Sequence, residues 1–264
     1  MCQYLLKFTS WSILLLFLRI VSPAQTIHWQ AEEQKLLHLH KKKQEAFVHQ
    51  TDSLAYYSTL FSQTFSQLIR NHSESFAYPF DSLTNYIACH VNISPDKKLK
   101  IYSWDTYLGG TMHFFHNLYQ YQWQDSLYCF MQPEEGVPDG FYTQVQTLET
   151  PQQTYYLATY NAIYSNREIS QKIRLLTLGD SLRWQHPLIE IGQTRTHEIQ
   201  LHYDFYTLPQ SLLYPIRLLM YNEKTKVLYV PVIEDNGTFT TKCQMYEFKN
   251  GYFKYTKTIK NPYL

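Results

Sequence analysis

Apolar positions in the first part of the chain recur with the period of a helix. From Trp29 to about His49 the sequence is rich in Glu, Lys, Gln and Leu and holds no Gly or Pro, which is typical of an exposed amphipathic helix. Asp52 is placed to cap a second helix, whose apolar residues are spaced by three and four: Leu54, Tyr57, Phe61, Phe65 and Leu68. The short link between the two runs predicts an antiparallel helical hairpin.

Further along the chain the pattern changes to that of β-strands. A short helix is predicted over 81–88, and beyond Lys98 the period falls from about 3.6 to about 2. Strands are expected over 99–104, 112–123, 126–131, 141–148, 155–164, 172–178, 181–184, 199–206, 216–221, 227–233, 238–248 and 252–257. Asn236-Gly237 and Asn250-Gly251 suit tight hairpin turns between the last strands. We expect an α+β fold, in which an N-terminal helical hairpin packs on a large antiparallel β-sheet or sandwich built of hairpins and a C-terminal meander.

The first residues have the three parts of a secretory signal peptide. Lys7 provides a basic start, an apolar run covers 11–21, and Ser22-Pro23-Ala24 is a small-residue cleavage site before Gln25. The run is shorter than the ~20 residues that a transmembrane helix needs, so a retained anchor is the less favoured alternative. We therefore expect a signal peptide over 1–24, a helical segment over 25–95 and an antiparallel β region over 96–264, with 25–264 forming one cooperative unit that is exported to the periplasm or secreted.

The composition and the net charge limit the classes of partner that we expect for this chain. The 23 basic and 22 acidic residues nearly cancel, so we expect no nucleic-acid partner, and no membrane span once the signal peptide is removed. The chain has 24 Tyr beside 15 Phe and 5 Trp but only 8 Gly, a mixture that favours strands. These aromatic residues are consistent with sheet packing, or with a platform on which a ligand such as a sugar stacks.

Cysteines and histidines give little sign of a metal or cofactor. After the predicted cleavage the chain keeps Cys89, Cys129 and Cys243, so at most one disulfide can form within it, and the sequence leaves the pairing open. None belongs to a C-x-x-C motif, and the histidines show no metal-ligand spacing. We expect no metal site and no cofactor.

The stretch from residue 102 to residue 116 is the most unusual part of the sequence. It holds two adjacent glycines between strand-like runs, and its candidate ligand-binding residues are Trp104, Asp105, Thr106, Gly109, Gly110, Thr111, His113 and His116. Asp105 is suited to act as an acid or base, with His113 or His116 as the titrating partner. The alternative is a tight turn in which Asp105 bonds its own backbone.

The same stretch carries a family resemblance. Ser103-Trp104-Asp105-Thr106 and Gly109-Gly110-Thr111-Met112-His113 resemble a pattern in a group of uncharacterised exported bacterial proteins. The resemblance extends over 101–121 and more faintly over 155–167 and 216–248. It implies a bacterial cell-envelope setting and no known activity.

Two functions remain open at this point. The first is an exported, non-catalytic cell-envelope protein that binds a glycan, peptide or protein through its sheet face and the 102–116 turn. The alternative is a hydrolase with Asp105 and His113 in a site assembled from loops, although no H-E-x-x-H, G-x-S-x-G, G-x-G-x-x-G or P-loop motif is present. An enzyme is expected to show a deep pocket lined by Asp105 and a histidine with a shifted pKa, and a binding module an exposed aromatic patch.

Overall fold

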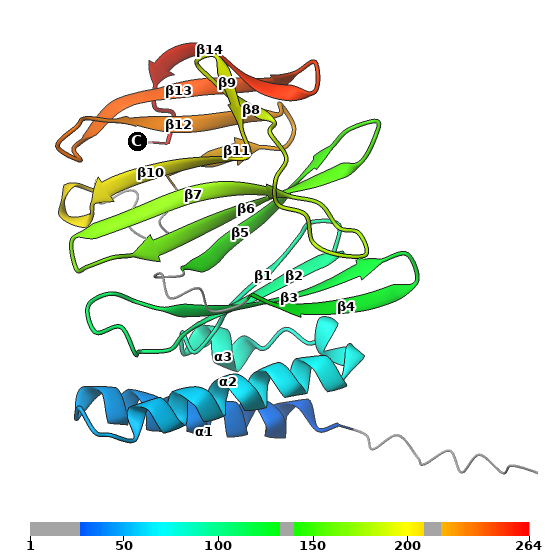
Figure 1. Cartoon of the computed structure of the whole chain (residues 1–264), viewed down its shortest axis with the longest axis vertical. Helices are drawn as coiled ribbons and strands as arrows, with labels where there is room; N and C mark the ends of the chain where they lie inside the picture. Colours follow the sequence, from blue (N-terminus) through cyan, green and yellow to red (C-terminus); the bar gives the residue numbers. More distant parts are fainter. Residues whose placement is uncertain (1–26, 133–139, 209–217, 264) are drawn as a thin grey trace, which may run out of the picture.

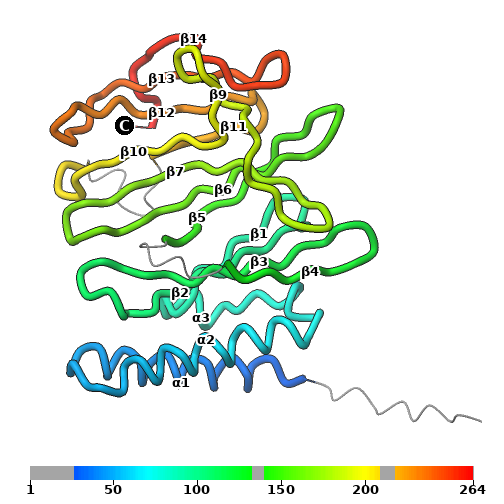
Figure 2. The backbone as a smooth tube through the Cα atoms, in the orientation of Figure 1, coloured from blue at the N-terminus to red at the C-terminus, as the bar shows by residue number. Residues whose placement is uncertain are grey.

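The chain has a mixed α+β fold, as the change of period predicts. The computed structural model describes residues 27–132, 140–208 and 218–263, and the predicted signal peptide lies outside them. A helical N-terminal region is followed by several largely antiparallel β-sheets (Figures 1 and 2). No helix in the described part of the chain combines the length and the apolarity that are needed to cross a membrane.

The two predicted N-terminal helices are present. They are α1 (Trp29–Val48) and α2 (Leu54–Asn71), followed by the short helices η1 (Ser73–Phe76) and α3 (Asp81–Asn85). α3 is shorter than the predicted 81–88, because Ile87 adopts a positive φ of 55° that a helix cannot accommodate. The capping role predicted for Asp52 is wrong. Ser53 is the residue that precedes α2, and its hydroxyl bonds Thr51 instead of a helix N–H group.

Within the described residues, the strands form three sheets of four, four and six strands. In the order in which they pair, the strands of the first sheet are β1 (His90–Ile93), β2 (Leu99–Asp105), β3 (Phe115–Trp123) and β4 (Ser126–Met131). Those of the second are β10 (Glu198–Asp204), β7 (Glu168–Leu176), β6 (Thr154–Ile163) and β5 (Phe141–Glu149). Those of the third are β11 (Met220–Asn222), β12 (Val227–Ile233), β13 (Phe239–Lys249), β14 (Tyr252–Lys260), β8 (Ile189–Ile191) and β9 (Thr194–Thr196). The short helix η2 (Phe205–Thr207) follows β10.

The C-terminal meander is confirmed for β11 to β14, which are successive antiparallel neighbours. Its turns use the expected residues, since Gly237, Asn250 and Gly251 have φ angles of 83°, 55° and 88°. Part of the predicted 216–221 strand lies outside the described residues. The third sheet also contains one parallel pair, β14 with β8, which the sequence does not predict.

Three strand predictions need correction. Residues 181–184 form only one isolated β-bridge, between Arg183 and Thr177. The N–H groups of His186 and Leu188 bond the carbonyls two residues before them in tight turns, so they do not extend this pairing into a strand. β3 begins at Phe115 instead of Met112, since the residues before it belong to the β2–β3 loop. β1 lies inside the segment that was expected to be helical and pairs with β2.

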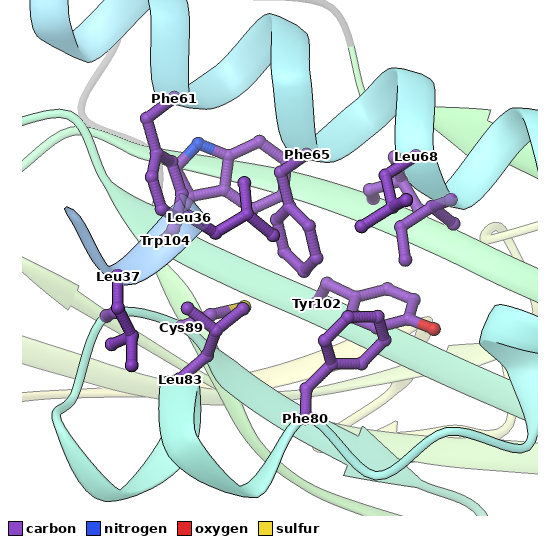
Figure 3. Packing of buried hydrophobic residues seen from close by; sticks show 13 residues of the cluster. Leu36, Leu37, Phe61, Phe65, Leu68, Phe80, Leu83, Cys89, Tyr102 and Trp104 are labelled. Carbon is purple, nitrogen blue, oxygen red and sulfur yellow. The ribbon is translucent and has the colours of Figure 1, made fainter. Parts of the chain in front are cut away.

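The elements stack in layers from the helices through the first and second sheets to the third (Figure 1). Figure 3 shows Phe61 and Phe65 of α2 beside Tyr102 and Trp104 of β2, and all four side chains belong to one buried cluster. The other face of the first sheet buries Ile101 and several tyrosines against the second sheet. A further apolar cluster lies between the second and third sheets. β2 is therefore buried on both faces, and its alternate residues reach different layers.

Candidate functional site

A pocket with a volume of about 570 Å³ lies between the first and second sheets. Its lining includes four residues of the 102–116 stretch: the candidate site residues Asp105 and His113, together with Tyr107 and Phe115. The rest comes mainly from β1 and the second sheet. The volume falls in the range of ~300–1,000 Å³ that is common for small-molecule sites.

The alternation of β2 decides which candidate residues reach the pocket. Adjacent strand residues point to opposite faces. Trp104 belongs to the cluster that packs against the helices, whereas Asp105 lines the pocket. β3 repeats this arrangement, because Asp105 pairs with Phe115 and Trp104 pairs with His116. Asp105 and Phe115 therefore face the pocket from neighbouring strands.

Asp105 and His113 form the polar centre of the pocket. Asp105 Oδ2 lies 2.5 Å from His113 Nδ1, and their side chains are 13% and 29% exposed. This hydrogen bond raises the pKa of His113, since it favours the protonated ring. The β2–β3 loop brings the two together, because the N–H of Thr106 bonds the carbonyl of Phe114 at 2.8 Å and turns the chain back on itself.

Contacts outside the loop also fix this pair. The backbone N–H of His113 bonds the carbonyl of Ile163 at 3.1 Å, which ties the loop to the end of β6. Asp105 Oδ1 accepts the N–H of Tyr107 at 2.8 Å, so the turn predicted from the sequence is present together with the His113 contact. On the helical side, Lys43 Nζ donates to the backbone carbonyl of Asp105 at 2.7 Å. Lys43 is only 1% exposed, and burial lowers its pKa to about 8.

Aromatic rings form one wall of the pocket. The ring of His90 stacks on Phe141 at 4.4 Å with an interplanar angle of 21°, and Phe115 lies 4.8 Å from Phe141 at 35°. His113 continues this wall at 6.4 Å from Phe115. Burial lowers the pKa of His90 to about 4, so its ring is neutral near neutral pH. We refer to His90, Phe115 and Phe141 as the aromatic wall.

Trp104 and His116 belong to the helix interface instead of the pocket. Trp104 Nε1 donates to Ser62 Oγ at 2.9 Å, and Ser62 Oγ lies 2.9 Å from His116 Nδ1. These bonds tie α2 to β2 and β3. The two side chains therefore do not join Asp105 and His113, although the sequence placed all four in one candidate site.

The other four candidate residues shape the loop and are not among the lining residues. Gly109 has no room for a side chain, because a Cβ atom there would lie 1.8 Å from the carbonyl oxygen of Met112. Gly110 has a φ of 66° and open space around it. Thr106 is buried and its hydroxyl accepts the N–H of Leu108, whereas Thr111 is exposed.

The sequence did not indicate several of the residues that line the pocket. His90 lies on an unpredicted strand, and Phe141 and Tyr203 come from strands far along the chain. Tyr203 is 3% exposed, and its hydroxyl has no hydrogen-bond partner in the described structure. Apolar and polar residues alternate over 199–206, which is typical of a strand with one buried face that includes Tyr203, but no local motif indicates a pocket beside it.

A second group of aromatic side chains falls short of the expected exposed aromatic patch, because Tyr121 between its two exposed members is only 2% exposed. Trp123 and Phe130 are 39% and 40% exposed and lie on the same face of β3 and β4. Between them Tyr121 stacks on Tyr128 at 5.2 Å with an interplanar angle of 11°. We call these four residues the β3–β4 aromatic strip.

Metal and cysteine chemistry is not evident at either surface. Within the described ranges, no group of three or more His, Cys, Asp or Glu side chains is arranged to hold a metal ion. Cys89, Cys129 and Cys243 are free thiols. Burial raises the pKa of each, which disfavours the reactive thiolate.

Comparisons with protein-family models, with curated proteins and with solved structures found no match to this chain. A proposal for its function therefore rests on the geometry of its own residues.

Proposed function

We propose that this chain is an exported cell-envelope protein that binds a ligand without catalysis, and that the ligand occupies the pocket at Asp105 and His113. The observation that carries the proposal is a pocket of about 570 Å³ that joins a hydrogen-bonded Asp105–His113 pair to the aromatic wall. A few placed polar groups among apolar and aromatic side chains are typical of small-molecule sites. The partner is an envelope glycan, peptide or protein that inserts one group into the pocket.

A pocket lined by Asp105 and a histidine with a shifted pKa is the feature expected of an enzyme, so the geometry of the pair supports a second candidate, a hydrolase. Asp105 bonds His113 at Nδ1, and no described residue bonds the opposite ring nitrogen. A carboxylate that orients a histidine in this way is the arrangement of a general base. The described lining contains neither Ser nor Cys, so the nucleophile would be water. The neutral form of His113 would take the water's proton at Nε2 as the oxygen bonds to the substrate, and would return it to the leaving group as the scissile bond breaks.

Substitution of the pair tests the proposed site. Asp105→Asn and His113→Gln should each weaken ligand binding tenfold or more, which is ~1.4 kcal/mol. Both variants should stay within ~1 kcal/mol of wild-type stability, because they preserve side-chain size at partly exposed positions. Denaturant melts are followed by titration with envelope glycan fragments and short peptides.

Two outcomes of this experiment are decisive. If both variants bind every ligand as the wild type does, the pocket is not the binding site. Turnover of model esters, amides or glycosides that disappears in His113→Gln, while binding persists, would replace the binding role with the hydrolase.

Export has its own test. We infer that cleavage after Ser22-Pro23-Ala24 releases a chain that begins at Gln25, because these are the well-placed small residues after the apolar run. Intact mass of the protein recovered from the periplasm or the medium should match 25–264. A mass that retains the leader would contradict export by this route.

We also infer that the helical hairpin packs on the sheets as part of one cooperative unit. Supporting this, Leu36 of α1 and Phe61 of α2 share a buried cluster with Tyr102 of β2. The hydrogen bond from Lys43 to Asp105 further couples the helices to the pocket.

A further inference from the structure

The lining of the pocket indicates the chemistry of its ligand, provided that the proposed binding function holds. The aromatic wall presents three rings at interplanar angles of 21° and 35° between neighbours. Ile87, Val91 and Ile163 add aliphatic surface to the same lining. Such a surface gains most from a flat, unsaturated group, because aromatic pairs contribute beyond the area that they bury.

Tyr203 supplies the second observation. Tyr203 is one of the residues that line the pocket and is 3% exposed, yet its hydroxyl has no hydrogen-bond partner in the described structure. Buried polar groups in folded proteins are nearly always paired, so an unpaired phenol beside a pocket indicates a missing partner. A ligand oxygen could accept this hydrogen. Because the hydroxyl is itself covered, contact requires a small shift of the lining side chains.

The charges around the pocket exclude a strong preference for an ion. Asp105 carries the negative charge of the lining and is bonded to His113, whose pKa it raises. Both carboxylate oxygens of Asp105 already accept hydrogen bonds, from His113 and from the N–H of Tyr107. The other lining histidine, His90, is neutral because burial lowers its pKa to about 4. The lining therefore offers a hydrogen-bond donor and no uncompensated charge for an ionic ligand.

We propose that the pocket binds an uncharged aromatic ring that carries an oxygen acceptor, with the ring against His90, Phe115 and Phe141 and the oxygen bonded to the hydroxyl of Tyr203. A pyranose ring fits less well, because its many hydroxyl groups would meet a largely apolar lining. An alkyl chain would leave the Tyr203 hydroxyl unpaired.

Four matched probes separate these classes. Acetophenone has the ring and the acceptor, ethylbenzene lacks the acceptor, cyclohexyl methyl ketone lacks the flat ring, and benzoate adds a charge. Affinities are measured by protein-observed NMR titration on the wild type, Tyr203→Phe and Tyr221→Phe. Tyr221 is the matched control, since its hydroxyl is also buried and unpaired but it is not among the pocket-lining residues.

In the wild type, acetophenone should bind at least fivefold more tightly than each of the other three probes. Tyr203→Phe should reduce acetophenone affinity about fivefold, as expected for one lost hydrogen bond, and leave ethylbenzene unchanged. The same variant should melt at a higher temperature than the wild type, because it removes an unpaired buried hydroxyl. Tyr221→Phe should also raise the melting temperature but should leave all four affinities unchanged.

Equal affinities for acetophenone and ethylbenzene, or no effect of Tyr203→Phe on either, would overturn this proposal. Tightest binding of cyclohexyl methyl ketone or benzoate in the pocket would show that the ligand class is wrong and leave the binding function intact. If no probe perturbs pocket resonances, the ligand class is wrong. The proposed binding function is contradicted as well only if the envelope glycans and peptides bind outside the pocket.

Discussion

Phe61→Ala should destabilise the protein by ~3–5 kcal/mol, the usual cost of truncating a buried aromatic side chain. Phe61 is fully buried, and its ring lies 6.2 Å from Trp104 and 5.9 Å from Phe65. Lys43 Nζ also lies over this ring at 4.6 Å, so truncation would open a cavity beside a buried cation. The measurement is a denaturant melt followed by far-ultraviolet circular dichroism, which reports mainly on the helices, and by near-ultraviolet circular dichroism, which reports on the packing of aromatic side chains that lie mostly in the sheets.

Tyr56→Ala is the matched control on the same helix. Tyr56 is 62% exposed, so its truncation should change stability by no more than ~0.5 kcal/mol. Both optical probes should give the same midpoint for Phe61→Ala if the chain unfolds as one unit. A loss below 1 kcal/mol, or separate transitions for helices and sheets, would show that the helical hairpin is an independent arm.

Gly109→Ala should destabilise the protein by ~3 kcal/mol, the upper end of the usual cost of overpacking. A Cβ atom at Gly109 would lie 1.8 Å from the backbone oxygen of Met112 and 2.4 Å from the ring of Phe114. Rotation of a side chain cannot relieve the first of these contacts, so the main chain of the loop has to move. Because Met112 is adjacent to His113, ligand binding should weaken in the same variant.

Gly110→Ala tests whether the destabilisation of Gly109→Ala comes from the steric clash of the added carbon or from the loss of a glycine in the loop. Gly110 has a φ of 66°, which costs an alanine ~1–2 kcal/mol, but nothing lies within 4 Å of the added carbon. It should therefore cost less stability than Gly109→Ala in thermal melts and should retain binding. Equal losses in the two variants would contradict the steric explanation.

Much of the fold could be predicted because it depends on local pattern. The spacing of Phe61, Phe65 and Leu68 defines one face of α2, and all three are buried in the structure. The change of period after Lys98 similarly predicts most strands. The missed strands β1, β8 and β9 have only three or four residues, so too few alternating positions exist to distinguish them from loops.

The candidate site was predictable in part. Asp105 and His113 were selected from the sequence, and both line the pocket. The same strand pattern already implies that Trp104 and Asp105 face opposite sides, so their separation could have been predicted as well. His90, Phe141 and Tyr203 could not have been found in this way, because their proximity depends on how different sheets pack.

The central claim, that the ligand binds on the Asp105 side of the first sheet, is tested most directly by comparing His113→Gln with His116→Gln. The two histidines are three residues apart, but His113 lines the pocket and His116 bonds Ser62 at the helix interface. The affinity of the tightest ligand among the envelope glycan fragments and the short peptides is measured for both variants. Our account predicts a loss of at least tenfold, ~1.4 kcal/mol, in His113→Gln and wild-type affinity in His116→Gln. Equal losses in both, or a loss confined to Trp123→Ala in the β3–β4 aromatic strip, would contradict it.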